Sequence, residues 1–302
     1  LRIVNCVEDH KYQGVYTNAP MSPVRLKAIT VTDEMKRATR GNAIVCSIAP
    51  DEDVAVLAGG HAADEVLWKN NITGYWCSSS YYGLYPSWAA DKNKEVHGRS
   101  SKWEPLLEVE MYNNFGEEAP DAFSYSFNGL KNIREYKTTA CVNDEINEMA
   151  KAYLESSLAG QDDIADCLSL TYYAGNYNGQ SMEERPIEIQ DMYVRLDRNI
   201  ADLLNYVDRR IGLENVVVSI ASTGYVIENS EDGAKYRLPS GTIYMDRIEG
   251  LLNVYLGAQF GKGDYVEGVY GPQLYLNRKA IERMKLDKLD VVSHTVEFLK
   301  SV

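Results

Sequence analysis

The sequence has 302 residues but no continuous apolar run as long as the ~18 residues that a membrane-spanning helix needs. It begins without Met, in a strand-like run, and lacks the basic start, apolar centre and small-residue cleavage site of a signal peptide. We therefore expect either a cytosolic protein or a mature or trimmed chain, and the abrupt start favours trimming. Lys and Arg are scarce, since 31 of them face 44 Asp and Glu, and the net charge is −13. This charge argues against a nucleic-acid backbone or an anionic membrane as the main partner.

Cysteine is also sparse, and its spacing excludes the common cysteine-based sites. The five cysteines contain no CxxC pair, so the sequence has neither a zinc knuckle nor a dense disulfide framework. Several lie in apolar runs, which favours buried thiols, while one disulfide remains compatible with an oxidising compartment. The cysteines are Cys6, Cys46, Cys77, Cys141 and Cys167.

The four histidines do not lie at ligand spacing from one another or from a cysteine. Only His61 has a setting typical of an active site, because the preceding glycines let the backbone turn sharply and expose an imidazole. The alternative is a residue that holds a helix-entry turn. The stretches ASTGYV (221–226) and GAQFGKGDYVEG (257–268) match neither a nucleophile elbow nor a phosphate loop. The residues alone therefore supply no catalytic set.

What is present is an alternation of strand-like and helix-like segments, which predicts an α/β protein with a mostly parallel central sheet flanked by helices. Residues 42–49, 166–173 and 215–223 read as buried strands. Residues 187–212 read as a long amphipathic helix, because apolar residues recur there every three or four positions. Residues 22–41 read as a helix with Ser22 as its N-cap. Because there are no repeats and no linker, we expect one domain over residues 1–302. Residues 74–136, which are rich in aromatics, form a predicted cap or insertion within it.

Three consecutive motifs carry a resemblance to a known family: DEMKRATRG (33–41), GHAADEVLW (60–68) and GYWCSSSYYGLYPSW (74–88). Together with the long helix and the strand that follows it, they resemble the alkaline phosphatase superfamily. The most similar branch is that of the bacterial alkaline phosphatases and type I phosphodiesterase/nucleotide pyrophosphatase-like proteins. The resemblance implies an alkaline-phosphatase-like fold over about residues 5 to 300. It also implies a bacterial, periplasmic or secreted protein.

Active members of this family use two zinc ions, which lower the pKa of a Thr or Ser nucleophile and neutralise the phosphoryl group. The family's "TD..GH" motif falls on residues 171–176, where Tyr172 and Asn176 stand in place of the Asp and His ligands. Its "TADHG" motif falls on residues 221–225, where Thr223 and Gly224 replace the other Asp and His. The family's nucleophile strand and last His have no counterpart in the chain. The region where relatives place a phosphate-binding Lys and Arg is acidic here, at residues 51–53. The resemblance therefore implies no metal, no cofactor and no catalytic residue.

Three functions remain open at this point. The first is a non-catalytic pseudoenzyme that binds or scaffolds a protein or small-molecule partner, as a monomer or a homodimer. The second is an active metal-dependent phosphomonoesterase or phosphodiesterase whose missing elements lie outside this chain. The third is a glycan- or nucleotide-binding module that uses the aromatic insertion around Trp76, Tyr81, Tyr82 and Trp88. A candidate pocket for a ligand consists of His61, Asp64, Trp76, Tyr81 and Tyr82.

Overall fold

The structure is a computed structural model that describes residues 5–95, 100–112, 122–128, 131–182, 184–222, 224, 244–271 and 273–301. The chain divides into two compact units, which are described separately below. The first unit spans Val4–Val226, and the second comprises Ile227–Val302 with Leu1–Ile3. The single domain over residues 1–302 stays a prediction.

The centre of the first unit is a five-stranded mixed sheet with the strand order β1-β4-β3-β2-β7. Strand β2 pairs in parallel with β3 and β7, whereas β4 runs antiparallel to both β3 and β1. The register places Cys46 of β2 opposite Glu65 of β3 and Leu168 of β7. The strands are β1 (Gly14–Val15), β2 (Val45–Ala49), β3 (Glu65–Lys69), β4 (Trp76–Ser79) and β7 (Cys167–Leu170). The predicted α/β class with a central sheet flanked by helices is confirmed, and the sheet itself is mixed.

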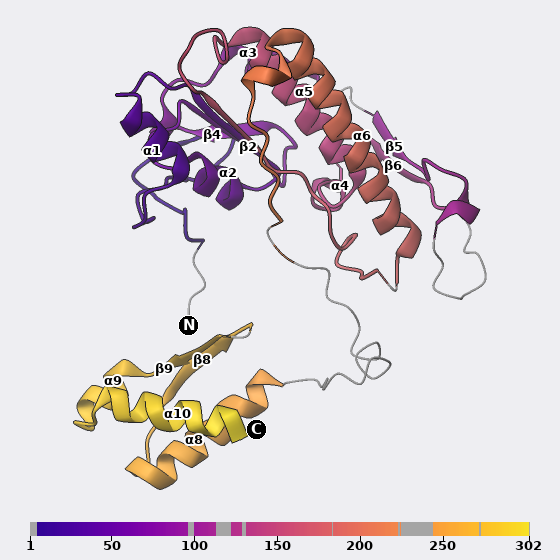
Figure 1. Cartoon of the computed structure of the whole chain (residues 1–302). Coiled ribbons are helices and arrows are strands. Elements are labelled where there is room, and N and C mark those ends of the chain that lie inside the picture. The colour runs from indigo at the N-terminus through magenta and orange to yellow at the C-terminus, as the bar shows by residue number, and fades with distance from the viewer. Residues whose placement is uncertain are drawn as a thin grey trace. The chain divides into compact units, whose positions relative to one another are not determined.

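Helices cover both faces of this sheet (Figure 1). Because side chains alternate along a strand, Cys46 and Ile48 of β2 point to one face and Val45 and Ala49 to the other. The first face packs against the long helices α5 (Ala140–Ser156) and α6 (Pro186–Arg210), which run parallel to each other, and the second packs against α2 (Glu52–Gly59). The sheet is therefore buried on both sides, which explains why β2 reads as a continuous apolar run.

The remaining elements of the first unit are short. The helix α1 (Val31–Ala38) precedes β2, and a hairpin of β5 and β6 lies beyond α5 and α6 (Figure 1). Strand β4 falls inside the predicted cap 74–136, yet it belongs to the central sheet. The short elements not yet given are η1 (Ser80–Tyr82), α3 (Ser87–Glu95), β5 (Ser100–Trp103), η3 (Val109–Met111), β6 (Tyr125–Asn128), α4 (Ile133–Tyr136) and η4 (Leu213–Asn215).

Two predicted elements are wrong. The helix predicted from Ser22 begins at Val31 instead, where Thr30 and Asp33 form a reciprocal capping box. Residues 216–222, predicted as a buried strand, form neither helix nor strand, and Val217 is 96% exposed. This apolar segment therefore does not join the sheet in the structure, although its β-branched composition suits one.

The second unit has its own small core. Three helices and an antiparallel strand pair enclose this core. In chain order they are α8 (Met245–Phe260), β8 (Val266–Tyr270), β9 (Gln273–Leu276), α9 (Arg278–Arg283) and α10 (Lys288–Ser301). Leu252, Leu256, Tyr265 and Val291 are its most buried side chains. In neither unit do the described residues include a helix that is long and apolar enough to cross a bilayer.

All five cysteines are free thiols in the structure. Cys46, Cys77 and Cys141 are buried, as predicted, whereas Cys6 is exposed. Burial raises the pKa of the Cys141 thiol to about 11 and that of Cys77 to about 12. These buried thiols therefore stay protonated and are packing residues rather than nucleophiles.

Candidate functional site

The carboxyl ends of β2 and β7 form the edge at which an α/β protein usually holds its chemistry. The backbone N–H of Thr171 donates to the Ile48 carbonyl at 3.0 Å, so the pairing of the two strands continues one residue beyond β7. The Asn143 side chain then holds the next loop through both its polar atoms. Its amide donates to the Tyr173 carbonyl and its oxygen accepts from the Tyr173 N–H, each at 2.8 Å.

Tyr172, which replaces a family Asp ligand, is turned toward the helices. Its hydroxyl donates to the side-chain oxygen of Asn147 on α5. The Asn147 amide in turn donates to the Asn199 carbonyl on α6 at 2.7 Å and reaches Asp202 at 3.2 Å. Burial, and then the charge of Asp202, raises the pKa of Tyr172. This residue is therefore a protonated phenol that ties β7 to α5 and α6, and not a metal-binding anion.

The other positions of the predicted metal site offer equally poor ligands. The Tyr173 hydroxyl donates to the Asn176 carbonyl at 2.5 Å, which closes the loop on itself. At Gly224 the only polar groups are the backbone atoms, and these exchange hydrogen bonds with the Ser222 hydroxyl. Thr223 lies outside the described residues, so its position is not part of this geometry.

A buried lysine lies at the same end of the sheet. Lys137 is 4% exposed, and its ammonium group contacts the Asp51 carboxylate at the start of α2. It also donates to the Asn71 side chain at 2.7 Å and to the Lys69 carbonyl at 3.3 Å. Asp51 keeps about half of its side chain exposed, so the outward-facing member of this pair is the acid.

Beneath this pair lies a fully buried ion pair between Lys69 and Glu145 at 2.9 Å. One Glu145 oxygen also accepts from the Trp76 indole at 3.0 Å, and the other accepts from the Tyr136 hydroxyl at 3.0 Å. The Lys69 ammonium donates further to the Gly74 carbonyl at 2.8 Å. Both charges are therefore matched by several hydrogen bonds, which is what burial of an ion pair requires.

The donors at this edge do not fit the two zinc ions of the active family. Zinc binds carboxylate, imidazole or thiolate groups, usually three or four together. The family positions that the structure describes present instead a phenol bound to Asn147, a carboxamide and a glycine. Across the residues whose placement is described, no three His, Cys, Asp or Glu side chains converge as metal ligands would.

The amino end of the parallel strands holds the other candidate residue, His61. Its Nδ1 contacts the Asp33 carboxylate at 2.9 Å and its Nε2 contacts the Leu26 carbonyl at 3.1 Å. The Asp33 carboxylate also accepts from the backbone N–H of His61, Ala62 and Thr30, at 2.7, 2.9 and 3.1 Å. Both ring nitrogens are thus engaged by protein acceptors, which favours the turn-holding role over a catalytic one.

The hydrogen bonds around Asp33 also change its acidity. Burial would raise the pKa of this carboxyl, but the hydrogen bonds from His61, Thr30 and Ala62 outweigh burial and lower the pKa from 3.8 to about 2. Asp33 is therefore an anion that organises the junction of α1, α2 and β3.

The structure brings together three of the five residues of the candidate pocket. Tyr81 donates to the His61 carbonyl at 2.9 Å, and Tyr82 donates to the Gly60 carbonyl at 3.0 Å. Asp64 instead binds Lys36 at 2.7 Å and the Val45 N–H at 2.8 Å, and Trp76 contacts Glu145 at the opposite end of β3. A ligand pocket formed by these residues stays a prediction.

Sequence reasoning missed the polar residues of α5 that organise the carboxyl edge. Asn143, Asn147 and Glu145 lie on a helix whose other inward residues are apolar. The four-residue spacing of the two asparagines, on one helix face, was a usable signal for a shared contact. Lys137 offered none, because its partner Asp51 lies 86 residues away in the chain.

The mixed sheet covered by helices on both faces, with family motifs at both ends of its strands, defines a member of the alkaline phosphatase superfamily. The family model of type I phosphodiesterase / nucleotide pyrophosphatase matches residues 14–294, and the chain belongs to this family.

Relatives and solved structures agree with this assignment. The chain is 26% identical to alkaline phosphatase PafA of Elizabethkingia meningoseptica, over 98% of this chain and 58% of that protein. It is 29% identical to a protein named calcium-transporting ATPase from Myroides odoratus, with the same shares of each chain covered. The crystal structure of wild-type PafA superposes with a TM-score of 0.78 at 26% identity, over 98% of this chain and 61% of the other. The chain thus spans less than two thirds of these proteins.

Proposed function

We propose that this chain is a phosphatase-like domain whose dimetal site is substituted, and that it works by binding or scaffolding rather than by catalysis. The observation that carries the proposal is the chemistry of the residues at the positions where the family resemblance implies metal ligands. A phenol, a carboxamide and a glycine occupy the positions where the family resemblance implies Asp and His.

The contacts of Tyr172 support this proposal beyond the identity of the residue. A side chain that merely replaced a ligand would still point toward the edge. Instead, the Tyr172 hydroxyl binds Asn147, which binds α6 through the Asn199 carbonyl. The Tyr172 side chain therefore has a structural role, and its hydroxyl is not available to bind a metal ion.

The charges at the edge support it as well. A phosphate ester is anionic, and catalysis needs positive charge where negative charge develops. The buried cation here, Lys137, is already paired with Asp51, whose carboxylate faces solvent. Without metal ions, an incoming phosphate would meet this carboxylate and an overall charge of −13.

An active hydrolase of phosphate monoesters or diesters is the second candidate. What favours it is the name of the relatives: two proteins matching almost all of this chain are called alkaline phosphatases. The match covers only 57–58% of those proteins, and under this candidate the missing catalytic elements lie outside this chain.

Zinc content and hydrolysis distinguish the two candidates. The purified chain is incubated with excess zinc, desalted and measured by elemental analysis, and is then assayed with p-nitrophenyl phosphate and bis(p-nitrophenyl) phosphate. We expect no stoichiometric zinc and no hydrolysis of either ester. Two equivalents of zinc together with hydrolysis would establish the active hydrolase instead. A vanadate-dependent rise in melting temperature would point the same way.

Reversal of the substitutions tests whether the site was emptied. A variant carrying Tyr172→Asp, Asn176→His, Thr223→Asp and Gly224→His restores the ligands that the resemblance implies, and we expect it to retain zinc after desalting. The matched control carries Tyr173→Asp and Asn178→His, which places the same residue types beside the family positions. Equal zinc retention by both variants would show nonspecific binding and would remove this support.

The location and assembly of the protein are further parts of the proposal. We place it outside the cytoplasm of a bacterium, which rests on the family resemblance and is tested by fractionation of the source cells. A homodimer is tested by light scattering over a range of concentrations, where a constant monomer mass would exclude it.

A further inference from the structure

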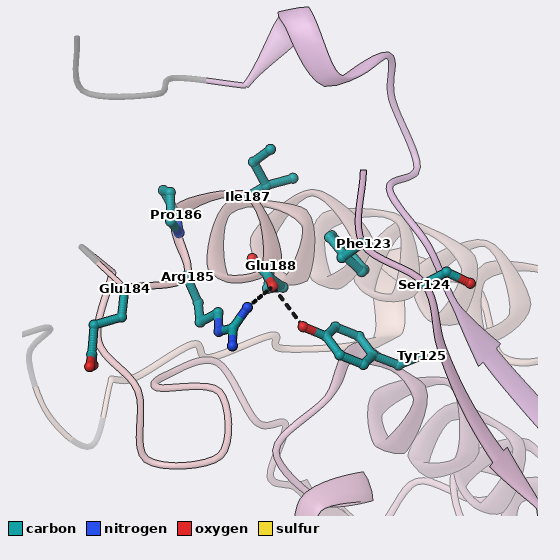
Figure 2. A pocket seen from close by; sticks show the side chains of 8 residues that line it. All are labelled: Phe123, Ser124, Tyr125, Glu184, Arg185, Pro186, Ile187 and Glu188. Carbon is teal, nitrogen blue, oxygen red and sulfur yellow. Dashed lines mark hydrogen bonds and ion pairs between the residues drawn. The ribbon is translucent and has the colours of Figure 1, made fainter. Parts of the chain in front are cut away.

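A cavity of about 230 Å³ lies between the segment that enters β6 and the first turn of α6 (Figure 2). It is smaller than the ~300–1,000 Å³ typical of sites for drug-sized ligands, so an occupant would be about the size of a single ring. Its lining comes from two segments some sixty residues apart: Phe123, Ser124, Tyr125, Glu184, Arg185, Pro186, Ile187 and Glu188.

The polar part of the lining is a built arrangement of three side chains. The Glu188 side chain is only 7% exposed, and one of its oxygens accepts from the Tyr125 hydroxyl at 2.9 Å. The same oxygen lies 3.5 Å from the Arg185 guanidinium, which is held in place by a 2.7 Å hydrogen bond from its Nε to Gln180. Figure 2 shows Tyr125, Arg185 and Glu188 pointing toward one another. A nearly buried carboxylate is thus fixed in the wall of the cavity, and its second oxygen has no hydrogen-bond partner among the residues the structure describes.

The Tyr125 phenol acts as a hydrogen-bond donor in this group. Burial, followed by the hydrogen bond to Glu188, raises the pKa of Tyr125 to about 12. Tyr125 therefore keeps its proton at neutral pH and orients the Glu188 carboxylate.

The apolar part of the lining is a rigid aromatic platform. The rings of Phe123 and Tyr125 stack with centroids 5.5 Å apart and planes at 26°. Trp103 supports Phe123 from 4.9 Å, and Tyr177 supports Tyr125 from 4.9 Å. The faces of such rings are electron-rich and attract the C–H groups of a saturated ring.

The charges of the lining select against ionic ligands. The lining carries two carboxylates, Glu184 and Glu188, against one guanidinium, so a phosphate or carboxylate ligand would be repelled. A cation fits poorly as well, because Arg185 already contacts Glu188 and Glu184 already accepts from the Ser181 N–H at 2.8 Å. What suits the cavity is a neutral molecule with hydroxyl groups on one side and C–H groups on the other.

We propose that this cavity binds one neutral sugar ring. Sugar hydroxyls would donate to Glu188 and accept from Arg185, and such charge-assisted hydrogen bonds are roughly twice as strong as neutral ones. The C–H face of the ring would lie against the platform of Phe123 and Tyr125. This site is independent of the phosphatase-like edge, because it uses none of the residues at the carboxyl ends of β2 and β7.

The proposal is tested by calorimetric titration of the whole chain with glucose, galactose, mannose and N-acetylglucosamine. Inorganic phosphate and tetramethylammonium serve as the anionic and cationic comparisons. We expect saturable binding of at least one sugar, accompanied by a change in tryptophan fluorescence, because Trp103 lies behind Phe123. Saturation by phosphate or tetramethylammonium with no sugar response would overturn the proposal, and so would the absence of any saturable binding.

Two variants locate the binding in this cavity. Tyr125→Phe and Glu188→Gln each remove one hydrogen-bonding group and keep the shape, so each should weaken sugar binding about ten- to a hundred-fold. The matched control is Tyr206→Phe, which removes a hydroxyl that donates to Glu155 at 3.1 Å away from the cavity, and should leave the affinity unchanged. Circular dichroism confirms that each variant is folded before titration. Equal affinities in all three variants would place the sugar elsewhere and contradict the proposal.

Discussion

The two ends of the parallel strands β2, β3 and β7 differ in how they use polar side chains. At the amino end, Asp33 and His61 keep a titratable pair, and each contact joins one segment of backbone to another. At the carboxyl end, Tyr172 and Asn176 stand where titratable ligands are expected, while the charged groups nearby are paired with one another.

This difference separates two reasons why a family motif persists. The "GH.AD" motif holds the junction of α1, α2 and β3, because His61 bridges the Leu26 carbonyl and Asp33. Such a role serves folding whether or not the protein is a catalyst. The "TD..GH" motif serves the metals in the family resemblance, and it is here that the residues have changed. Retention of the "GH.AD" motif is therefore weak evidence of catalytic activity, whereas loss of the "TD..GH" residues is strong evidence against it.

The largest effect is expected from the buried charges beneath the carboxyl end. Glu145→Ala leaves the Lys69 ammonium buried without its carboxylate and removes the acceptor of Trp76 and Tyr136. Breaking a buried pair in this way should lower the free energy of unfolding by about 3–5 kcal/mol, measured by urea denaturation. The control, Glu155→Ala on the same helix, removes the acceptor of a solvent-exposed hydrogen bond from the partly buried Tyr206 and should cost below about 1 kcal/mol. Similar losses in both variants would contradict the role given to the pair.

The next effect tests the amino end through pH. Because the pKa of Asp33 is about 2 in the folded protein against 3.8 when unperturbed, its ionised form stabilises the fold above about pH 4. That contribution, about 2 kcal/mol, is lost as the pH falls from about 4 toward 2. Urea denaturation across this range should show a weaker pH dependence in Asp33→Asn than in the unsubstituted chain. Identical slopes would show that the carboxylate does not hold this junction.

A smaller effect separates two adjacent tyrosines at the carboxyl end. Tyr172→Phe removes a hydrogen bond to Asn147 inside the α5–α6 contact and should lower stability by about 1–2 kcal/mol. Tyr173→Phe removes an exposed hydrogen bond within its own loop and should cost less than about 0.5 kcal/mol. Thermal melts of the two variants provide the comparison. The reverse order would mean that Tyr172 faces the edge after all.

The smallest expected effect is that of zinc on the unsubstituted chain. A metal that binds the folded state raises the melting temperature in proportion to its occupancy. Since the edge presents no suitable ligands, neither added zinc nor a chelator should shift the melting temperature. A clear upward shift of the melting temperature that the chelator reverses would show that the carboxyl edge binds metal. It would contradict the difference drawn between the two ends of the sheet.

The sequence predicted well those elements that local patterns determine. The strand ending at Ala49 and the long helix now bounded as Pro186–Arg210 follow from a continuous apolar run and a helical period. The helix expected from Ser22 failed because Thr30, eight residues later, forms the true capping box. The strand expected at residues 215–223 failed for another reason. Strand formation needs a partner, and composition alone does not supply one.

The candidate site was predictable in part. The positions of Tyr172 and Asn176 at a strand end followed from the apolar run before them. The direction of the Tyr172 side chain did not, because Asn147 lies 25 residues earlier in the sequence and only the packing of α5 on the sheet brings it near. The same holds for the cavity between Tyr125 and Glu188, whose two walls are 63 residues apart.

The exposed segment of residues 216–222 also affects the tendency of the protein to self-associate. Val217, Val218 and Ile220 present 96%, 50% and 76% of their surfaces to water, in a stretch without charge or proline. Such β-prone segments pair readily with another extended chain when no strand of their own sheet covers them. A single charged residue placed in this stretch is therefore expected to reduce self-association of the chain.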